Sequence, residues 1–371
     1  MSPCSESGSD PLASLPVHLN KTDLLGLTFE QLELALDHWG VGKGQAKRVF
    51  RGLHVKQQAL TEIESLGRHA QVIAQHSEIA QARLVTAVKS PDGTEKLLLE
   101  LYDGAQIEAV LLPMRRERYT LCVSTQVGCA MACAFCATGT MGLKRTLSAG
   151  ELVAQVYQAF QYVQTKFNQS GPQDQKVLSH LVLMGMGEPL HYYERTRSAL
   201  KVLLGQHGLC FSARKVTVST VGLVPAMQRF SQDFEGRVQL ALSLHAGRDE
   251  TRQKIMPVAK KWPLALLKET LLKHPLPGRR VLMLEYVVLP GVNDSPEELD
   301  AVAEFCTGLR ALVNLIPFNP FKNSPFRSPT EAEVLAVDQG LKQRGVPCSI
   351  RVTRGREKSG ACGQLAIEGY A

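Results

Sequence analysis

The feature that most limits the possible folds is the alternation of strand-like and helical segments from residue 119 onwards. Repeated about six times, it indicates an α/β fold with a parallel sheet, either open or curled towards a barrel. The first helical segment begins with Ser148 and Glu151 in capping-box spacing. The strand-like stretches are YTLCVST, SHLVLMG, RKVTVST, RVQLALSL, RVLMLEYVVL, ALVNLIPF and PCSIRVT, which start at residues 119, 179, 214, 237, 280, 311 and 347.

Four of these stretches end in motifs that contain glycine or polar residues. In parallel α/β folds, ligands bind at the carboxyl ends of the strands. The motifs GMGEP, STVG, SLHA and PFNP start at residues 185, 219, 243 and 317, and each lies at such an end. The sequence therefore predicts a single catalytic face.

The residues before 119 have a different pattern. Residues 21 to about 75 are predicted to be helical, and one helix begins with Thr28 and Gln31 in capping-box spacing. Three strand-like stretches between residues 82 and 113 are separated by turns and predict a small antiparallel unit. We expect a flexible tail over 1–20, an accessory domain over 21–115 and a catalytic core over 116–371.

Composition favours a globular cytosolic protein. Hydrophobic residues make up 44% of the chain and charged residues 21%, as in soluble domains. The first 20 residues lack the pattern of a signal peptide, and the longest apolar stretch is half the length of a membrane span. Nine cysteines, an odd number, do not suggest a disulfide framework. Clustered cysteines in such a protein are expected to bind metal or to react.

Three cysteines are clustered in GCAMACAFCATG, where Cys129, Cys133 and Cys136 have the spacing C-x3-C-x2-C. Structural zinc needs four ligands, so Cys122 or a histidine would have to complete such a site. A cubane iron–sulfur cluster also normally takes four cysteines, and with three it leaves one iron open to a substrate. The spacing, with Phe135 before the third cysteine, resembles the radical S-adenosylmethionine (SAM) superfamily, in which the open iron binds SAM and a 5′-deoxyadenosyl radical is formed.

The motif LMGMGEP follows the next strand-like stretch and fits beside the cysteines. A glycine turn at Gly187 can bring backbone groups close to the SAM amino group, and Glu188 adds an opposite charge. The alternative is that the glycines only permit a turn.

Two further cysteines stand out by position. Cys122 precedes the cluster, and Cys362 lies in GACG after a run of arginines and a lysine. Nearby cations stabilise a thiolate, and small neighbours leave the sulfur accessible. Either cysteine could instead be a small buried apolar residue, as we expect for Cys210, Cys306 and Cys348.

From about residue 21 to 371 the chain resembles the RlmN/Cfr family of radical-SAM methyltransferases, which act on adenosine in ribosomal and transfer RNA. The resemblance implies a partial (β/α)6 radical-SAM barrel with an N-terminal helical and antiparallel-strand accessory domain. It implies methylation of an adenine ring carbon, with C2 favoured and C8 the alternative. The matching stretches are IEAVLLP, TLCVSTQVGCAMACAFCATG, GLKRTLSAGELVAQV, LMGMGEPL, VTVSTVG, LSLHA, NLIPFNPF and VTRGREKSGACGQL.

The resemblance also assigns roles. Cys362 takes a methyl group from one SAM, loses a hydrogen atom to a radical made from a second SAM, and joins the adenine carbon. Cys122 then releases the product through a transient disulfide. Glu108 matches the candidate general base, although a solvent-facing strand residue is the alternative. The three clustered cysteines would bind one [4Fe-4S] cluster, and the matched SAM-binding residues are Gly187, Glu188, Ser219, Ser243, Leu244, His245 and Asn319.

The net charge of +7 is compatible with an RNA partner. Basic clusters occur as MRRER, ARK, GRR and RVTRGREK, starting at residues 114, 213, 278 and 351. We expect RNA contacts from the first and last of these and from the N-terminal helical hairpin, although an ordinary hairpin and solvated faces are the alternatives. The resemblance implies an electron donor such as flavodoxin or ferredoxin, and we expect a monomer.

Two other functions remain open. A radical-SAM enzyme of another class, such as one that activates a protein, would need neither Cys122 nor Cys362. An RNA-binding protein whose cluster senses redox state would not cleave SAM and would not need Glu188 or Ser219.

Overall fold

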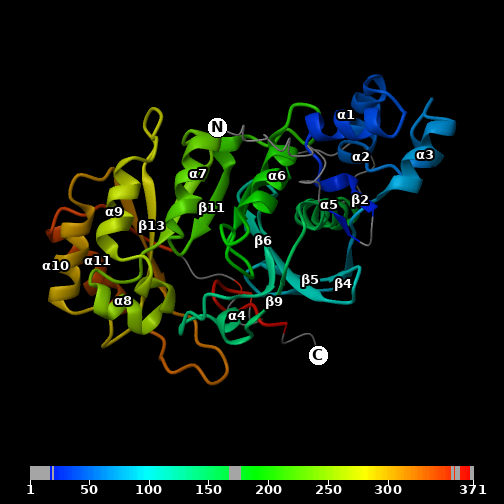
Figure 1. The fold of residues 1–371 in the computed structure, drawn as a ribbon. Helices are drawn as coiled ribbons and strands as arrows, with labels where there is room; N and C mark the ends of the chain where they lie inside the picture. Colours follow the sequence, from blue (N-terminus) through cyan, green and yellow to red (C-terminus); the bar gives the residue numbers. More distant parts are fainter. Residues whose placement is uncertain (1–16, 19–20, 167–176, 352–354, 356–359, 368–371) are drawn as a thin grey trace, which may run out of the picture.

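The computed structural model describes residues 17–18, 21–166, 177–351, 355 and 360–367. Its main feature is a ten-stranded sheet in the order β15-β14-β13-β12-β11-β10-β7-β6-β5-β4 (Figure 1). Each strand-like stretch predicted from residue 119 overlaps one of the seven parallel strands. These are β7 (Arg118–Cys122), β10 (Leu178–Leu183), β11 (Val216–Thr220), β12 (Gln239–Ser243), β13 (Leu282–Val288), β14 (Ala311–Pro317) and β15 (Cys348–Ile350).

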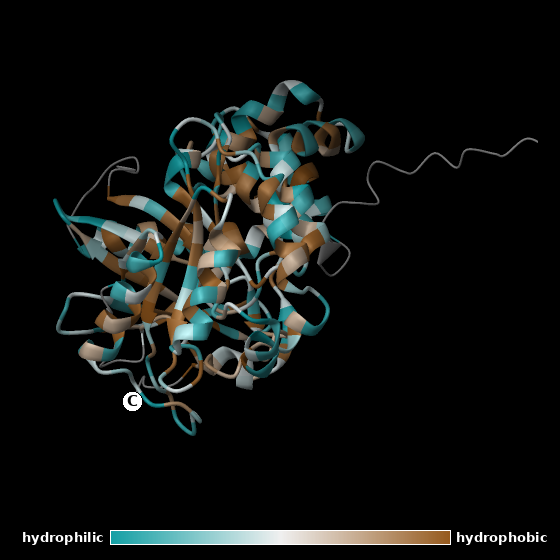
Figure 2. Cartoon of the chain, turned by 90° about the vertical axis from the view of Figure 1, so that its left-hand side faces the viewer, coloured by the Kyte–Doolittle hydropathy of each residue, from teal (hydrophilic) through white to brown (hydrophobic). Residues whose placement is uncertain are grey.

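Helices form the crossovers between successive parallel strands, as the alternating pattern predicted. The capping box of the first helix is present, with the Ser148 backbone N–H 2.8 Å from Glu151 Oε2 and the Glu151 N–H 3.0 Å from Ser148 Oγ. Apolar residues concentrate on the strands, and hydrophilic residues occur on the outer helices (Figure 2). The crossover helices are α5 (Ala149–Lys166), α6 (Tyr193–Leu204), α7 (Val224–Phe234), α8 (Asp249–Ile255), α9 (Leu264–Leu272), α10 (Pro296–Cys306) and α11 (Glu331–Gln343). These strands and helices form the α/β core, the partial barrel that the resemblance implied.

The antiparallel strands β4 (Ala82–Lys89), β5 (Glu95–Leu101) and β6 (Gln106–Met114) do not form a unit of their own. They extend the large sheet, because β6 pairs with β7 in an antiparallel register that sets Val110 opposite Cys122. The expected boundary between residues 115 and 116 falls in the turn of this hairpin. The sheet therefore runs across it without a break.

The N-terminal residues form a compact helical layer on one side of the sheet (Figure 1). The predicted capping box is present, with the Gln31 N–H 3.3 Å from Thr28 Oγ1 and the Thr28 N–H 3.0 Å from Gln31 Oε1. The layer contacts α5 closely: a Cβ on Gly26 would come within 2.9 Å of the Gly150 nitrogen. Its elements are β1 (Val17–His18), β2 (Lys21–Asp23), η1 (Leu24–Gly26), α1 (Phe29–His38), η2 (Lys43–Gln45), α2 (Ala46–His54), η3 (Leu60–Glu62), α3 (Arg68–His76) and β3 (Ser77–Glu78). Most of the expected tail, 1–20, lies outside the described residues.

A small hairpin of β8 (Gln126–Gly128) and β9 (Leu143–Thr146) holds the loop with the three clustered cysteines and the short helix α4 (Ala137–Thr140). Two 3-10 turns, η4 (Ala213–Lys215) and η5 (Pro257–Lys260), complete the described elements. The sequence patterns did not predict the β8–β9 hairpin. In the described part of the chain, no helix has both the length and the apolar character that a membrane span requires.

Candidate active site

The cysteine loop is closed at its base by a tight crossing of two backbones. The Cys129 N–H donates to Gly142 O at 3.0 Å. Gly128 has a φ of 76°, and a Cβ there would lie 1.8 Å from the same oxygen, so glycine is required. Farther along, the Ala134 N–H donates to Ile255 O at 2.9 Å and fixes the loop to the end of α8. The loop is therefore held at its base and near its middle.

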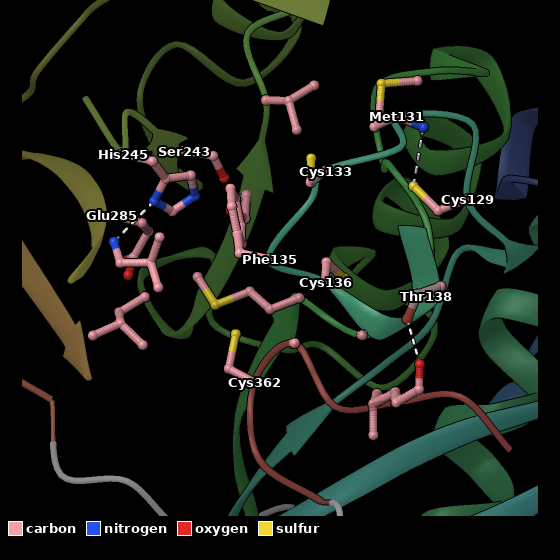
Figure 3. Close-up of a pocket in the computed structure, with 18 of the residues that line it drawn as sticks. Cys129, Met131, Cys133, Phe135, Cys136, Thr138, Ser243, His245, Glu285 and Cys362 are labelled. Atoms are coloured by element: carbon pink, nitrogen blue, oxygen red, sulfur yellow. Dashed lines mark hydrogen bonds between the residues drawn. The ribbon is translucent and has the colours of Figure 1, made fainter. Parts of the chain in front are cut away.

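The three cysteines of this loop line one cavity (Figure 3). Burial raises the pKa of Cys129 to about 12, and burial together with the neighbouring thiols raises the pKa of Cys133 well above its usual value. Burial also raises the pKa of Cys136. These thiols are protonated in the metal-free chain, and metal binding would displace their protons. Within the described residues, no group of three or more His, Cys, Asp or Glu side chains is arranged to hold a single metal ion.

The GMGEP motif lies against the strand that leads to the cysteines. A Cβ on Gly187, whose φ is 98°, would come within 2.5 Å of the Gln126 side chain. Glu188 is buried, and its two carboxylate oxygens accept the backbone N–H groups of Leu190 at 3.0 Å and Val221 at 2.9 Å. Burial nevertheless raises the pKa of Glu188 to about 7. The site thus holds a carboxylate that a bound cation would stabilise.

The ends of β11 and β12 contribute the other predicted cavity residues. Ser219, Ser243 and His245 line the same cavity as the cysteines. His245 has a left-handed φ of 60°, and its Nδ1 accepts the Val287 N–H at 3.0 Å (Figure 3). Burial lowers the pKa of His245 to about 3, so the ring is neutral and Nε2 carries its proton. His245 is suited to donate a hydrogen bond rather than to exchange protons.

Leu244 is fully buried and does not line the cavity. Its carbonyl accepts Arg252 Nε at 3.0 Å, and Arg252 Nη2 reaches the carbonyls of Val221 at 2.7 Å and Ser243 at 3.0 Å. The Arg252 side chain is completely buried, and burial lowers its pKa to about 10. Arg252 therefore fixes the ends of two strands that carry cavity residues. The sequence reasoning missed it because its contacts are all to backbone atoms.

Asn319 follows β14 and is 4% exposed. Its Oδ1 is buried and has no hydrogen-bond partner among the residues that the structure describes. Asn319 lines the cysteine cavity and also a second, adjoining cavity, and Phe318 beside it lines the first. A buried, unpartnered acceptor at this position can take a hydrogen bond from a ligand.

The segment with Cys362 is fastened to the cysteine loop, although 226 positions separate Cys136 from Cys362 in the chain. The Ala137 N–H donates to Gly363 O at 2.8 Å, and Thr138 Oγ1 donates to Leu365 O at 2.5 Å (Figure 3). Figure 1 likewise shows the red C-terminal segment beside α4. Cys362 is exposed, and it lines both cavities. The predicted reactive thiol therefore lies where the two cavities meet.

Cys122 is buried at the end of β7 and lines the second cavity together with Cys362. Burial raises the pKa of Cys122 to about 12. Arg351, at the end of β15, lines both cavities, and its charge interacts with Cys122, Cys362 and Glu285. Sequence reasoning grouped Arg351 with a basic surface cluster and missed this placement. A single cation thus acts on both cysteines that the resemblance implicates.

Glu108 is completely buried, so the alternative that it faces solvent is wrong. Its carboxylate forms an ion pair with Lys96 on the neighbouring strand β5. Glu108 does not itself line either cavity, but Val110, two positions further along β6, lines the second. Alternation along a strand puts Glu108 and Val110 on the same face of the sheet. The sequence analysis did not single out Lys96.

The donor set fits the cofactors of the radical SAM superfamily. Three thiols from one loop face a cavity whose other walls supply a buried carboxylate, a neutral imidazole and an unpartnered amide oxygen. Thiolates hold iron–sulfur clusters, and the remaining groups match the ammonium, hydroxyl and amine donors of SAM. Residues 123–306 match the radical SAM superfamily, which implies a [4Fe-4S] cluster and SAM.

Relatives extend this likeness over almost the whole chain. The "Dual-specificity RNA methyltransferase RlmN" of Syntrophobacter fumaroxidans is 39% identical, over 90% of this chain and 96% of its own length. The "Dual-specificity RNA methyltransferase RlmN 2" of Myxococcus xanthus is 40% identical, over 97% of this chain and 94% of its own length. A crystal structure of a radical SAM methyltransferase from Sphaerobacter thermophilus superposes with a TM-score of 0.83 at 37% identity, covering 93% of this chain and 99% of that one. The chain belongs to the RlmN family of radical SAM RNA methyltransferases.

Proposed function

We propose that this protein methylates an adenine ring carbon of ribosomal or transfer RNA, or of both, at C2 rather than C8, through a methyl group carried on Cys362. The observation that carries the proposal is the position of Cys362. Its thiol lines the cavity of the three clustered cysteines and also the cavity that contains Cys122. One sulfur can therefore be methylated in the first cavity and meet an RNA base in the second.

Cys129, Cys133 and Cys136 would hold one [4Fe-4S] cluster, and Glu188, Ser219, Ser243, His245 and Asn319 would bind SAM beside it. When bound, these cofactors supply a methyl group and, from a second SAM, a 5′-deoxyadenosyl radical. The Glu188 carboxylate would pair with the SAM ammonium. Asn319 Oδ1, which has no partner in the described part of the chain, would accept a hydrogen bond.

Cys362 first acts as a nucleophile: its thiolate takes the methyl group and S-adenosylhomocysteine leaves. The methyl carbon on Cys362 would then lose one hydrogen atom to the 5′-deoxyadenosyl radical, and the resulting carbon radical would bond to the adenine ring. A base removes the proton from the substituted ring carbon, and the remaining unpaired electron would return to the bound cluster. The Cys122 thiolate finally attacks the Cys362 sulfur. The bond between this sulfur and the methylene carbon breaks as the disulfide forms, and the released carbon takes up a proton to become the methyl group.

Glu108 is our candidate for the base that removes this proton. Its carboxylate is held by the ion pair with Lys96, on the same face of the sheet as Val110, which lines the second cavity. Because Glu108 does not line the second cavity, it would act after a local rearrangement or through a water molecule.

An external electron donor such as flavodoxin or ferredoxin would reduce the cluster. The N-terminal helices and the basic segments near residues 115 and 355 would contact the RNA.

The test uses anaerobically reconstituted protein with SAM, a reductant and cellular RNA fragments. Nucleosides are separated and compared by mass spectrometry with 2-methyladenosine and 8-methyladenosine standards. We expect 2-methyladenosine with the wild type and none with Cys362→Ala. Cys348→Ala is the matched control, because this thiol lies outside both cavities. SAM cleavage without any methyladenosine would contradict the proposed substrate, and full activity of Cys362→Ala would contradict the proposed intermediate.

A further inference from the structure

Two basic clusters that the proposed function does not use come together in space. The ARK cluster at 213–215 precedes β11, and the GRR cluster at 278–280 precedes β13. Arg214, Arg279 and Arg280 nevertheless line one surface hollow, which Arg237 also lines. Arg279 and Arg280 also line a second hollow, together with Arg310 and Arg344. The two hollows share residues, so we treat them as one feature, the arginine groove.

The arginine groove lies at the end of the barrel opposite the cysteines. Each of its arginines comes just before one of the parallel strands β11 to β15, whereas the cavity residues come at or after the ends of the strands. Figure 1 shows the loop before β13 and helix α4 at opposite ends of the strands. A strand of five to seven residues spans about 17–23 Å. The groove is thus separate from the proposed active site.

The charge of this groove is largely uncompensated. None of the residues that line its two hollows is an aspartate or a glutamate. Arg344 is paired with Asp300 at 2.6 Å outside the lining, and Arg237 is 3.7 Å from the exposed Glu235. The neighbouring charge of Arg214, after the larger effect of burial, lowers the pKa of Arg280. Such a concentration of like charge attracts an anion.

Four of the six arginines fall into two kinds. Arg280 and Arg310 donate hydrogen bonds to backbone carbonyls, such as Arg237 O at 2.5 Å and Gly278 O at 2.9 Å, and so brace the loop before β13. Arg214 and Arg279 are exposed, and within the described residues their guanidinium groups make no hydrogen bond or ion pair. Support of the loop before β13 therefore accounts for the presence of Arg280 and Arg310 in the groove. It does not account for Arg214 and Arg279.

We infer that the arginine groove binds the phosphate backbone of RNA, at a part of the substrate distant from the adenine that is modified. This inference rests on the proposed function. Guanidinium groups pair with phosphates in a bidentate manner, and a groove with several of them suits a chain of phosphates better than a single small anion. An acidic electron-donor protein would also be attracted to it. It is disfavoured because electrons would have to cross the length of the barrel to reach the cysteines.

The experiment compares the wild type with the double variant Arg214→Gln/Arg279→Gln, which removes two charges without touching the bracing arginines. The double variant Lys201→Gln/Arg229→Gln is the matched control, with two exposed charges removed from α6 and α7. Binding of full-length transfer RNA and of ribosomal RNA fragments is measured between 50 and 200 mM KCl. Each lost phosphate contact reduces the slope of log K against log salt by about 1. We expect the groove variant to bind about tenfold more weakly at low salt, with a slope shallower by about 2.

The separate readout is methylation of a short hairpin that contains the target adenosine. We expect the groove variant to methylate this hairpin at the wild-type rate, because the hairpin does not reach the groove. An unchanged affinity and slope for long RNA would overturn the inference while leaving the proposed function intact. Slower reduction by flavodoxin with unchanged RNA binding would overturn it in favour of the electron donor. If the wild type methylates no RNA but binds it with the predicted slope difference, the proposed function fails and the groove assignment stands.

Discussion

Lys96 Nζ lies 2.9 Å from Glu108 Oε1, and neither side chain is exposed by more than 1%. Removal of one partner from such a buried pair typically destabilises a protein by about 3–5 kcal/mol, because the other charge loses its partner. Glu108 lies on the same face of the sheet as Val110, which lines the second cavity. Its loss would therefore affect stability and catalysis together, and the two effects have to be measured separately.

For Glu108→Gln we expect a loss of stability of this size and a loss of methylation. The double variant Glu108→Gln/Lys96→Met leaves no unpaired charge and should recover most of the stability, measured by urea unfolding, without recovering methylation. Lys96→Met alone should be destabilised like Glu108→Gln. If the double variant methylates RNA at the wild-type rate, Glu108 is not the base.

The charge of Arg351 bears on the release of product. The Arg351 guanidinium lowers the pKa of Cys122, against the larger opposite effect of burial. Its loss would leave less Cys122 thiolate to attack the Cys362 sulfur. We expect Arg351→Met, like Cys122→Ala, to accumulate a covalent protein–RNA adduct, seen as a shifted band on a denaturing gel. Arg351→Lys keeps the charge and should show roughly tenfold less adduct than Arg351→Met. Equal adduct in both Arg351 variants would show that the charge is not what matters.

Glu188 gives the cluster-free protein a distinct dependence of stability on pH. Its pKa is about 7 in the folded chain and 4.5 when unfolded. Both states bind the proton below pH 4.5, so burial of the acid costs nothing there, and the folded chain is penalised as the pH rises through 7. The shift from 4.5 to about 7 corresponds to roughly 3 kcal/mol. The free energy of urea unfolding should fall by this amount from pH 4.5 to pH 8 relative to Glu188→Gln. If the free energy of unfolding depends on pH in the same way in the wild type and in Glu188→Gln, the raised pKa of Glu188 is contradicted.

Gly128 is required where the cysteine loop closes. A methyl group at this position would overlap Gly142 O, and the left-handed φ adds strain. We expect Gly128→Ala to fold with its barrel intact by circular dichroism but to retain less than about a tenth of the iron, measured as iron per chain after anaerobic reconstitution. Gly104→Ala is the control, because Gly104 also has a positive φ but has open space around it. Equal iron loading by the two variants would contradict this role of Gly128.

The sequence predicted the elements whose pattern is local. The alternating segments gave all seven parallel strands, and the capping boxes at Thr28 and Ser148 are formed as expected. Residues that act through backbone atoms or through distant partners left no such pattern. Arg252 binds carbonyls on two strands, and Lys96 meets Glu108 across the sheet. Only the folded chain brings these partners together, so neither could be read from spacing.

Continuity of the sheet from β4 to β15 limits how this chain can be divided. In a chain that began at residue 116, β7 would become an edge strand with a row of unsatisfied backbone groups. Cys122, the last residue of β7, would lie at this exposed edge. Hybrid enzymes with an exchanged RNA-recognition segment should therefore be joined before β4, near residue 80, rather than at the β6–β7 turn. The helical layer can be grafted between relatives, whereas the antiparallel strands must be inherited together with the barrel.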